Sequence, residues 1–358
     1  MSYLLYDSRI DWNSLKQRPQ YLAECLTEYF DVVYTCTRLY KRGVINPNAN
    51  KKLVIKHFNY VPLLYRNKFT SKINNALQSL FYKTNLRRYK PVSVIISDAK
   101  KINNIKKWFN GPIIYDCMDD HSALNTKQKD EILDYERFAV TESSYTIVSS
   151  SHLYELMISR YGKKIEEKLV LIRNGCNCSD LPEYIQDADD SCSFTLCYFG
   201  TIGTWFDFDM IQNSLNDFPN LEYLIIGNAR PGITMPNNPR IHYLEAVPHD
   251  QLAEKTRKCN AFVMPFVVND IVLSVDPVKL YEYISLGKDI LCVDYPEIRR
   301  FSEFIYAYND YNSYKNQLEN IMKTSIRKYS RRQKEKFLEE NSWHSRVSQI
   351  VNIVEKLL

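Results

Sequence analysis

Residues 276–288, DPVKLYEYISLGK, predict one short helix of about three turns with a defined start and end. Asp276 is a favourable N-cap, Pro277 suits the first helical position, and Gly287 is typical of a helix C-terminus. The free N–H groups and the positive dipole end at such a start attract anions. We therefore expect this helix start to hold a diphosphate without a metal ion, with Lys279 adding a positive charge.

Around this helix the chain alternates short β-rich runs with helix-length segments, which is typical of a parallel sheet covered on both faces. In the first half the predicted strands are 3–6, 32–36, 53–57, 92–97, 113–117, 145–149 and 169–172, and the helices are 17–29, 73–89, 127–141 and 152–161. In the second half the predicted strands are 194–199, 223–226, 241–244, 261–265 and 290–293, and the helices are 207–216, 250–257 and 277–286. The sequence therefore predicts two Rossmann-like domains of the α/β class.

The segment between the two alternations is polar and rich in turn residues. We expect an N-terminal domain at 1–180, a linker at 181–193, a second domain at 194–340 and a C-terminal helix at 341–358. Open α/β sheets bind ligands at the carboxyl ends of their strands. Two such domains are expected to face each other across a cleft that holds the substrates.

Composition excludes several classes of protein. The chain has 358 residues, of which 45% are hydrophobic and 25% charged, so it can bury a core and is not a disordered or fibrous chain. No apolar run is long enough to span a bilayer, and we expect a cytoplasmic protein. The net charge is +5, with the basic excess in the first half, which favours an anionic acceptor or a contact with the inner face of the membrane.

The segment 276–288 resembles the nucleotide-binding helix of GT-B glycosyltransferases of the family 4 type, which act in capsule, teichuronic-acid and lipopolysaccharide assembly. Further landmarks of that group occur in the same order along the chain. They are Trp12 with Gln17 to Gln20, Tyr115 to Asp120, Arg173 to Gly175, Tyr198 to Ile202, and Asn341 to Trp343. The resemblance implies sugar transfer from a UDP- or GDP-type donor, bound by the second domain, to an acceptor bound by the first.

By this resemblance Glu282 binds the donor ribose, and the backbone of Asp276, Pro277, Val278 and Lys279 holds the diphosphate. Gly200 and Thr201 lie in the loop that approaches the phosphates, where the absence of a side chain at Gly200 permits close contact.

Two departures from the family pattern stand out. The position eight residues before Glu282 is Ser274 rather than a glutamate, and Asp270 is the nearest acid upstream. The usual Arg/Lys pair after the glycine loop is also absent, which shifts the positive charge to Lys279 or Arg230. Retention of anomeric configuration is the outcome that the resemblance implies, while Ser274 leaves inversion open.

The acceptor side has candidates at the end of the strand 113–117. Asp120 is the candidate general base, with His121 as its neighbour or a sugar contact and Asp119 beside them, although aspartates here also suit helix capping. Arg18 is a candidate contact for a donor or acceptor phosphate, or else an ordinary surface arginine.

The expected partners are a nucleotide sugar and a glycan or lipid-linked acceptor of a bacterial surface polysaccharide, with no nucleic acid and no cofactor.

We expect no metal site: the nine cysteines form no CxxC pair, the histidines show no ligand spacing, and Asp207 and Asp209 suit a helix start. Two alternatives remain, namely a non-catalytic nucleotide-sugar-binding scaffold subunit and a sugar-nucleotide epimerase on the same fold.

Overall fold

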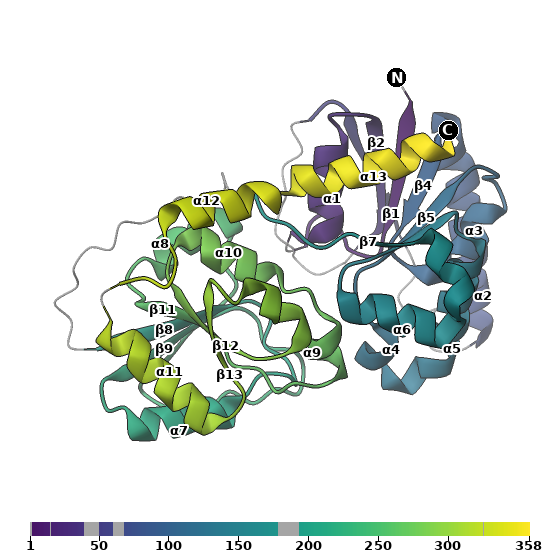
Figure 1. Ribbon diagram of the computed structural model, residues 1–358. Coiled ribbons are helices and arrows are strands. Elements are labelled where there is room, and N and C mark those ends of the chain that lie inside the picture. Colours follow the sequence, from purple (N-terminus) through teal and green to yellow (C-terminus); the bar gives the residue numbers. More distant parts are fainter. Residues whose placement is uncertain (1, 15, 39–49, 60–67, 178–192, 325) are drawn as a thin grey trace. The chain divides into compact units, whose positions relative to one another are not determined.

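The computed structural model describes residues 2–14, 16–38, 50–59, 68–177, 193–324 and 326–358. The chain forms two compact units, which we describe separately. The first unit comprises Met1–Arg173 together with Trp343–Leu358, and the second comprises Asn174–Ser342 (Figure 1).

The first unit is built on a seven-stranded parallel sheet with the order β3-β2-β1-β4-β5-β6-β7. Its strands are β1 (Tyr3–Ser8), β2 (Asp31–Thr37), β3 (Leu53–Phe58), β4 (Ser93–Ile96), β5 (Ile113–Cys117), β6 (Tyr145–Val148) and β7 (Leu169–Leu171). Most residues of the central strands are buried, as expected for a parallel sheet with both faces covered. All seven strands lie where the hydrophobic pattern predicts them.

Helices cover both faces of this sheet. They are α1 (Arg18–Leu26), α2 (Lys68–Phe81), α3 (Ile102–Lys106), α4 (His121–Leu124), α5 (Lys129–Glu142), α6 (Ser151–Tyr161) and α13 (Trp343–Leu357). The core on one face joins side chains of the sheet to α1 and α13, and the core on the other face joins them to α3, α5 and α6.

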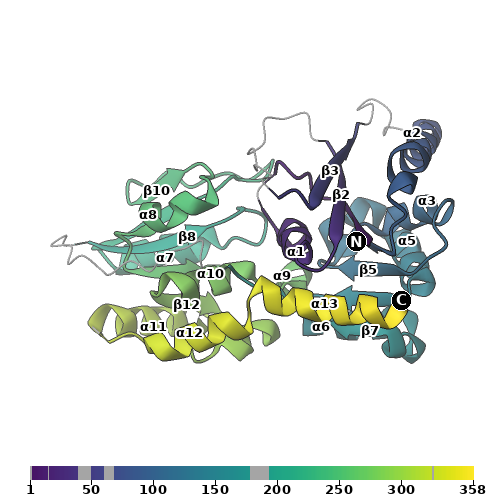
Figure 2. The same cartoon turned by 90° about the horizontal axis from the view of Figure 1, so that it is seen from above.

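The last helix, α13, belongs to the first unit although it follows the whole second unit in sequence. Figure 2 shows it beside α1, and the ring of Trp343 stacks on that of Tyr21 with a centroid distance of 5.1 Å. Val347, Ile350 and Val354 are fully buried on the same helix face, as its amphipathic pattern predicts. Of the predicted separate segment 341–358, the residues from Trp343 onward therefore belong to the first unit and contribute to its core.

The second unit has a six-stranded parallel sheet with the order β10-β9-β8-β11-β12-β13. Its strands are β8 (Phe194–Phe199), β9 (Leu221–Ile226), β10 (Ile241–Leu244), β11 (Ala261–Met264), β12 (Asp289–Val293) and β13 (Ile305–Tyr308). Its helices are α7 (Phe208–Asp217), α8 (Leu252–Thr256), α9 (Asp270–Ser274), α10 (Val278–Leu286), α11 (Tyr311–Lys323) and α12 (Arg331–Glu340). One continuous apolar core holds this unit together.

The two parallel sheets confirm the predicted α/β class with two Rossmann-like domains. The unit boundary lies between Arg173 and Asn174, a few residues before the expected end of the first domain. The expected linker 181–193 lies almost entirely outside the described residues. Among the described helices, none has the length and apolar character that crossing a bilayer would require.

Candidate functional site

Two glycines bring the loops after β8 and β9 into close contact. Gly200 follows β8 with φ +142°, and Gly227 follows β9 with φ +148°. A Cβ atom on Gly227 would lie 1.9 Å from the carbonyl oxygen of Gly200, so only glycine fits there. Between the loops, Gly200 N–H donates to Ile226 O at 2.8 Å and Arg230 N–H donates to Ile202 O at 2.9 Å. The backbones of the two loops therefore lie directly against each other at the carboxyl edge of this sheet.

Lys279 lies over this glycine loop. A Cβ atom on Gly200 would lie 2.0 Å from Cε and 2.9 Å from Nζ of Lys279, so the lysine occupies the space that Gly200 leaves open. Burial lowers the pKa of Lys279, partly offset by the charge of Glu282. The ammonium group makes no hydrogen bond or ion pair with a described residue, and it lies 5.8 Å from the ring centroid of Tyr198. A half-buried cation in this position lacks an anion.

The helix that carries Lys279 begins at Val278, one residue later than predicted, with Pro277 as its N-cap and no side-chain cap. The first N–H groups of a helix have no partner within it and suit an anionic ligand. Gly287 ends the helix in the left-handed conformation with φ +74°, as the sequence predicts.

Asp276 has a different role from the predicted N-cap. Its buried carboxylate accepts hydrogen bonds from the backbone N–H of Asn174 at 2.6 Å and from the Tyr281 hydroxyl at 3.0 Å, and it pairs with Arg300. The Asn174 side chain also donates to Asp276 O at 2.7 Å. Asp276 therefore anchors the start of α10, and its side chain is not aimed at a ligand.

Glu282 lies one turn after Lys279 and pairs with His249. Its Oε1 lies 2.8 Å from Nε2 of His249, and its side chain is 14% exposed. Its Oε2 makes no hydrogen bond to any described residue, so the carboxylate keeps an open acceptor. His249 comes from the segment before α8, far away in sequence, and no spacing rule connects the two residues.

Arg230 and Thr201 complete this edge of the sheet. Arg230 is exposed, and its guanidinium lies 4.6 Å from the ring centroid of Trp205. Thr201 is half-buried, and its carbonyl accepts a hydrogen bond from the Tyr198 hydroxyl at 2.8 Å. The structure thus gathers Gly200, Thr201, Arg230 and Lys279 on the loops and the helix start at one edge of the second sheet.

The residues of the first departure from the family pattern, Asp270 and Ser274, lie on α9. Asp270 is an exposed residue in its first turn, and the Ser274 hydroxyl donates to Ile271 O at 2.9 Å. Ser274 is therefore engaged within its own helix.

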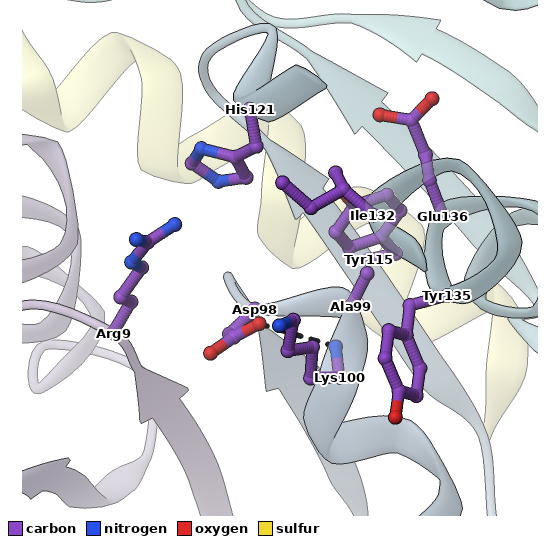
Figure 3. A pocket seen from close by; sticks show the side chains of 9 residues that line it. All are labelled: Arg9, Asp98, Ala99, Lys100, Tyr115, His121, Ile132, Tyr135 and Glu136. Atoms are coloured by element: carbon purple, nitrogen blue, oxygen red, sulfur yellow. Dashed lines mark hydrogen bonds between the residues drawn. The ribbon is translucent and has the colours of Figure 1, made fainter. Parts of the chain in front are cut away.

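The first unit has a pocket at the carboxyl ends of β1, β4 and β5. The space between its lining residues is about 290 Å³, a volume that includes open solvent, and these residues are Arg9, Asp98, Ala99, Lys100, Tyr115, His121, Ile132, Tyr135 and Glu136. Figure 3 shows the ring of His121 and the guanidinium of Arg9 pointing into the same space. Both ring nitrogens of His121 are buried without a hydrogen-bond partner among the described residues. A ligand with hydroxyl groups would supply those partners.

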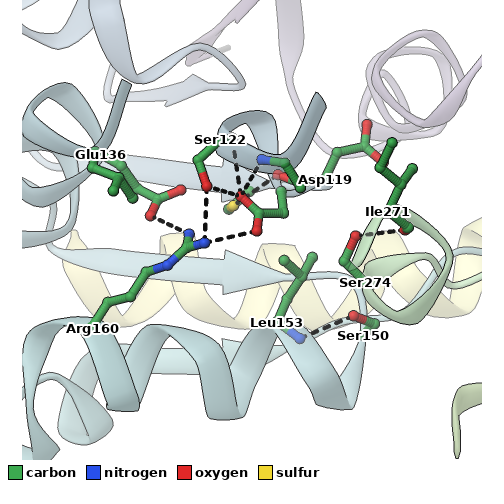
Figure 4. A network of polar contacts seen from close by, with 12 residues as sticks. Asp119, Ser122, Glu136, Ser150, Leu153, Arg160, Ile271 and Ser274 are labelled. Atoms are coloured by element: carbon green, nitrogen blue, oxygen red, sulfur yellow. Dashed lines mark hydrogen bonds and ion pairs between the residues drawn. The ribbon is translucent and has the colours of Figure 1, made fainter. Parts of the chain in front are cut away.

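Asp120 is committed to structural contacts. Its Oδ1 caps α4 by accepting from the Ser122 N–H at 3.0 Å, and its Oδ2 pairs with Arg160 at 2.7 Å. Burial alone would raise the pKa of Asp120, but hydrogen bonds from Arg160 and Ser122 outweigh it and the pKa is lowered. Arg160 also pairs with Glu136 at 2.9 Å (Figure 4). A carboxylate held in this way is a poor general base, and the capping alternative describes it better.

Asp119, beside it, is half-buried, and its backbone carbonyl accepts a hydrogen bond from the Cys117 thiol at 3.6 Å.

Arg18 is not available for a phosphate. Its guanidinium is buried and bound by both oxygens of Asp116, with Nε at 3.0 Å and 3.1 Å, while Nη1 donates to Arg173 O at 3.0 Å. Tyr6 donates to the same carboxylate at 2.6 Å. Arg18 joins α1 to β5 in the core, which corrects both the phosphate contact and the surface arginine that the sequence suggests.

The basic residues of the first unit differ in whether they are paired with an acid. Lys101 is buried and pairs with Asp7 at 2.6 Å, and Lys106 pairs with Glu142. Lys83, Arg87, Arg88 and Lys90 are exposed. They follow a face of α2 on which Ile73, Leu77 and Leu80 are 38%, 41% and 57% exposed. This second group retains the character of an anionic-surface contact.

Comparison with solved structures identifies the fold. The chain is similar to a sucrose-phosphate synthase from Thermosynechococcus elongatus, with TM-score 0.78, 13% identity and coverage of 100% of this chain and 99% of that one. It is similar to the lipopolysaccharide outer core galactosyltransferase WaaB in its apo form, with TM-score 0.63, 13% identity and coverage of 98% and 99%. A third similar structure is Anabaena HepE in complex with UDP and glucose, with TM-score 0.68, 12% identity and coverage of 99% of both chains.

No family model matches the sequence, and no curated protein matches it either. The likeness therefore extends over the whole chain in three dimensions while little of the sequence is shared.

Proposed function

We propose that this chain, which has the GT-B fold of two Rossmann-like domains, is a glycosyltransferase that uses a nucleotide-sugar donor. The observation that carries the proposal is the unpaired Lys279 over Gly200 at the start of α10. A half-buried cation beside free backbone N–H groups is a site for a diphosphate, because it supplies charge and donors together. Nucleotide sugars carry that group next to the bond that is broken.

The second unit would hold the donor through four features. Lys279 and the first N–H groups of α10 bind the diphosphate, the absence of a side chain at Gly200 leaves room for Lys279 beside that helix start, and Arg230 adds a second cation. Glu282 accepts hydrogen bonds from the ribose hydroxyls through Oε2, with His249 fixing its orientation. The negative charge that develops on the leaving diphosphate is then stabilised by protein cations, and we propose transfer without a metal ion at the phosphates.

The first unit would hold the acceptor. The pocket at Arg9, His121 and Glu136 is lined by charged and aromatic side chains, and the unsatisfied nitrogens of His121 suit hydroxyl groups. Because Asp120 is held by Arg160 and a helix cap, it is a poor base for the inverting attack of an acceptor hydroxyl. We therefore propose retention of anomeric configuration, which the product's proton NMR coupling constants test directly.

The acceptor that we propose is a growing bacterial surface glycan, lipid-linked, handled at the inner face of the membrane. The support comes from the resemblance of the sequence motifs and from α2. Its exposed Ile73, Leu77 and Leu80 lie on one helix face, and Lys83 and Arg87 follow them. Flotation with vesicles containing anionic lipid tests this assignment: a Leu77→Asp, Leu80→Asp double variant should lose binding that the parent protein shows.

The decisive experiment compares Lys279→Met with Lys255→Met, an exposed lysine on α8 of the same unit. Nucleoside diphosphates and a panel of UDP- and GDP-sugars are tested for thermal stabilisation and then for transfer. Losing one charge-assisted contact of about 1.5–3 kcal/mol should weaken diphosphate binding roughly 10- to 150-fold in Lys279→Met and leave it unchanged in the control. Equal affinities in the two variants would contradict the diphosphate site.

The same panel separates the two alternatives. A scaffold subunit would bind a nucleotide sugar but release no nucleoside diphosphate with any acceptor. An epimerase would convert the donor alone into an isomeric nucleotide sugar, without an acceptor. Release of nucleoside diphosphate that depends on an added glycan is the result that transfer requires.

A further inference from the structure

Three ligand-type side chains meet at the carboxyl edge of the first sheet, outside the pocket described above. Cys36 lies near the end of β2 and His57 near the end of β3, and the two are direct partners in the parallel register. Ser8 at the end of β1 is the partner of Cys36 on its other side. Since register partners in a parallel sheet point to the same face, the thiol and the imidazole lie on one face of neighbouring strands.

Asp11 enters this face from the loop after β1. Its Oδ1 lies 3.4 Å from Nε2 of His57 and 4.0 Å from Sγ of Cys36. One ligand atom from each of the three residues lies within 4.8 Å of the others. These separations span the edges of a coordination polyhedron with metal–ligand bonds of about 2.0–2.3 Å, after small side-chain adjustments.

The loop that carries Asp11 is held in place by its own contacts. The N–H of Asn13 donates to Asp11 Oδ1 at 3.1 Å, and the Ser14 hydroxyl donates to Asp11 O at 2.7 Å. The N–H of Trp12 donates to Cys36 Sγ at 3.4 Å. Asp11 and Cys36 are 4% and 1% exposed, so a cation here would be largely shielded from water. The three donors are therefore positioned before any ligand arrives.

One nitrogen of the His57 imidazole lacks a hydrogen-bond partner among the described residues, so the three side chains do not satisfy one another. Nε2 of His57 is buried, and it makes no hydrogen bond with a described residue, because the contact with Asp11 lacks hydrogen-bond geometry. A buried ring nitrogen that faces a carboxylate and a thiol without a shared hydrogen bond needs another partner. A metal ion at the centre of the three would satisfy it.

We propose that Asp11, Cys36 and His57 bind one divalent cation of the zinc class, with water as a further ligand. A sulfur, nitrogen and oxygen donor set is typical of zinc and disfavours magnesium and calcium, which prefer oxygen alone. Binding releases the thiol proton of Cys36 to water and forms the zinc–sulfur bond.

The cation would fasten the β1 loop to β2 and β3. Its ligands belong to the first unit, so the site is separate from the diphosphate site of the second unit, where we propose no metal. Sequence reasoning expects no metal because these three residues come from three segments with no motif spacing, and only the strand register brings them together.

The test uses the full chain, purified with a chelator and then dialysed. Zinc alone is titrated in competition with a chromophoric chelator, and cobalt(II) is used as a spectroscopic replacement. We expect one zinc ion per chain, a sulfur-to-cobalt charge-transfer band, and a higher melting temperature with zinc than without it. Absence of zinc binding at micromolar concentrations, or a cobalt spectrum without a thiolate band, would overturn the proposal.

His57→Gln is the informative variant because the His57 side chain is 23% exposed and its loss should leave the core intact. The matched control is His242→Gln, whose histidine likewise pairs with an acid, Glu222, but has no cysteine in the pair. Zinc affinity should fall at least about 100-fold in His57→Gln, more than outer-sphere changes cost, and stay unchanged in the control. Equal affinity in the two variants would place the metal elsewhere and refute the site. Cys36→Ala, if it folds, should lose the cobalt thiolate band as well.

Discussion

Replacing Gly227 by alanine tests the contact on which the proposed phosphate-binding edge depends. The new Cβ would lie 1.9 Å from the carbonyl oxygen of Gly200, whereas real Cβ atoms are essentially never closer than 3.0 Å. The loops after β8 and β9 would have to separate by about 1 Å, and backbone atoms on both sides leave no flexible side chain to yield. The φ of +148° adds strain for any residue with a side chain.

The control for this prediction is Gly232→Ala. Gly232 also has a positive φ, +87°, but a Cβ there meets nothing within 4 Å, so the substitution carries backbone strain without a collision. We expect a loss of about 1–2 kcal/mol of unfolding free energy for Gly232→Ala. For Gly227→Ala we expect at least about 3 kcal/mol, since strain and overlap add.

Urea unfolding followed by circular dichroism measures both losses, and thermal shift with a nucleoside diphosphate measures the site. A unit of this size loses roughly 2–4 °C of melting temperature per kcal/mol, so the two variants should differ measurably. Gly227→Ala should also lose ligand-dependent stabilisation, because Gly200 moves away from Lys279. If Gly227→Ala is as stable as Gly232→Ala and still binds the nucleotide, the close approach of the two loops is not what shapes the site.

Two further predictions concern the first unit. Arg18→Met should lower the free energy of unfolding by about 3–5 kcal/mol, because it leaves the carboxylate of Asp116 buried without its cation. The affinity for a diphosphate should stay unchanged. Weaker diphosphate binding at wild-type stability would restore Arg18 as a ligand contact. The folded pKa of Asp120 lies below its unfolded value, so its stabilisation is present above the unfolded pKa, near 3.8, and is lost as the pH falls through the folded pKa. Asp120→Asn should therefore show a smaller loss of stability below about pH 4 than the parent protein does, and identical acid profiles would contradict the ion pair with Arg160.

Hydrophobic patterning was sufficient to predict most of the fold. Buried parallel strands are short apolar runs between helix-length segments, so the pattern predicts all seven strands of the first sheet and five of the six in the second. It misses β13, because Ile305–Tyr308 is four residues long and its central pair, Tyr306 and Ala307, is partly exposed. The helices α11 and α12 are also missed, since their sequences are dominated by polar residues.

The candidate site was predictable only in part, and the reason lies in which contacts are local. The residues that start and end α10 are close in sequence, so the pattern predicts the terminator Gly287 correctly and the start to within one residue, although the N-cap is Pro277 and not Asp276. The pair of Glu282 with His249 depends on tertiary packing, and so does the contact of Gly227 with Gly200. A glycine directly after a predicted strand was the one available signal for Gly227.

Charged residues were the hardest to interpret. Arg18 and Lys101 have the sequence context of solvated helix surface, yet both are buried with a carboxylate. Their acids, Asp116 and Asp7, lie within β5 and β1, and the register of the sheet decides which basic residue they meet. No pattern in one sequence contains that information.

The position of α13 has a consequence for how this protein is made. The first unit's core includes Trp343 and its helix, which leave the ribosome only after the entire second unit has been synthesised. The segments at Cys176 and Ser342 pair side by side, with the N–H of Cys176 donating to Asn341 O at 3.1 Å, so the late segment is held beside the early one. During translation the apolar surface around Tyr21 in the first unit would stay uncovered until α13 is synthesised, while the second unit can already fold. The order of maturation would therefore run opposite to the order of synthesis.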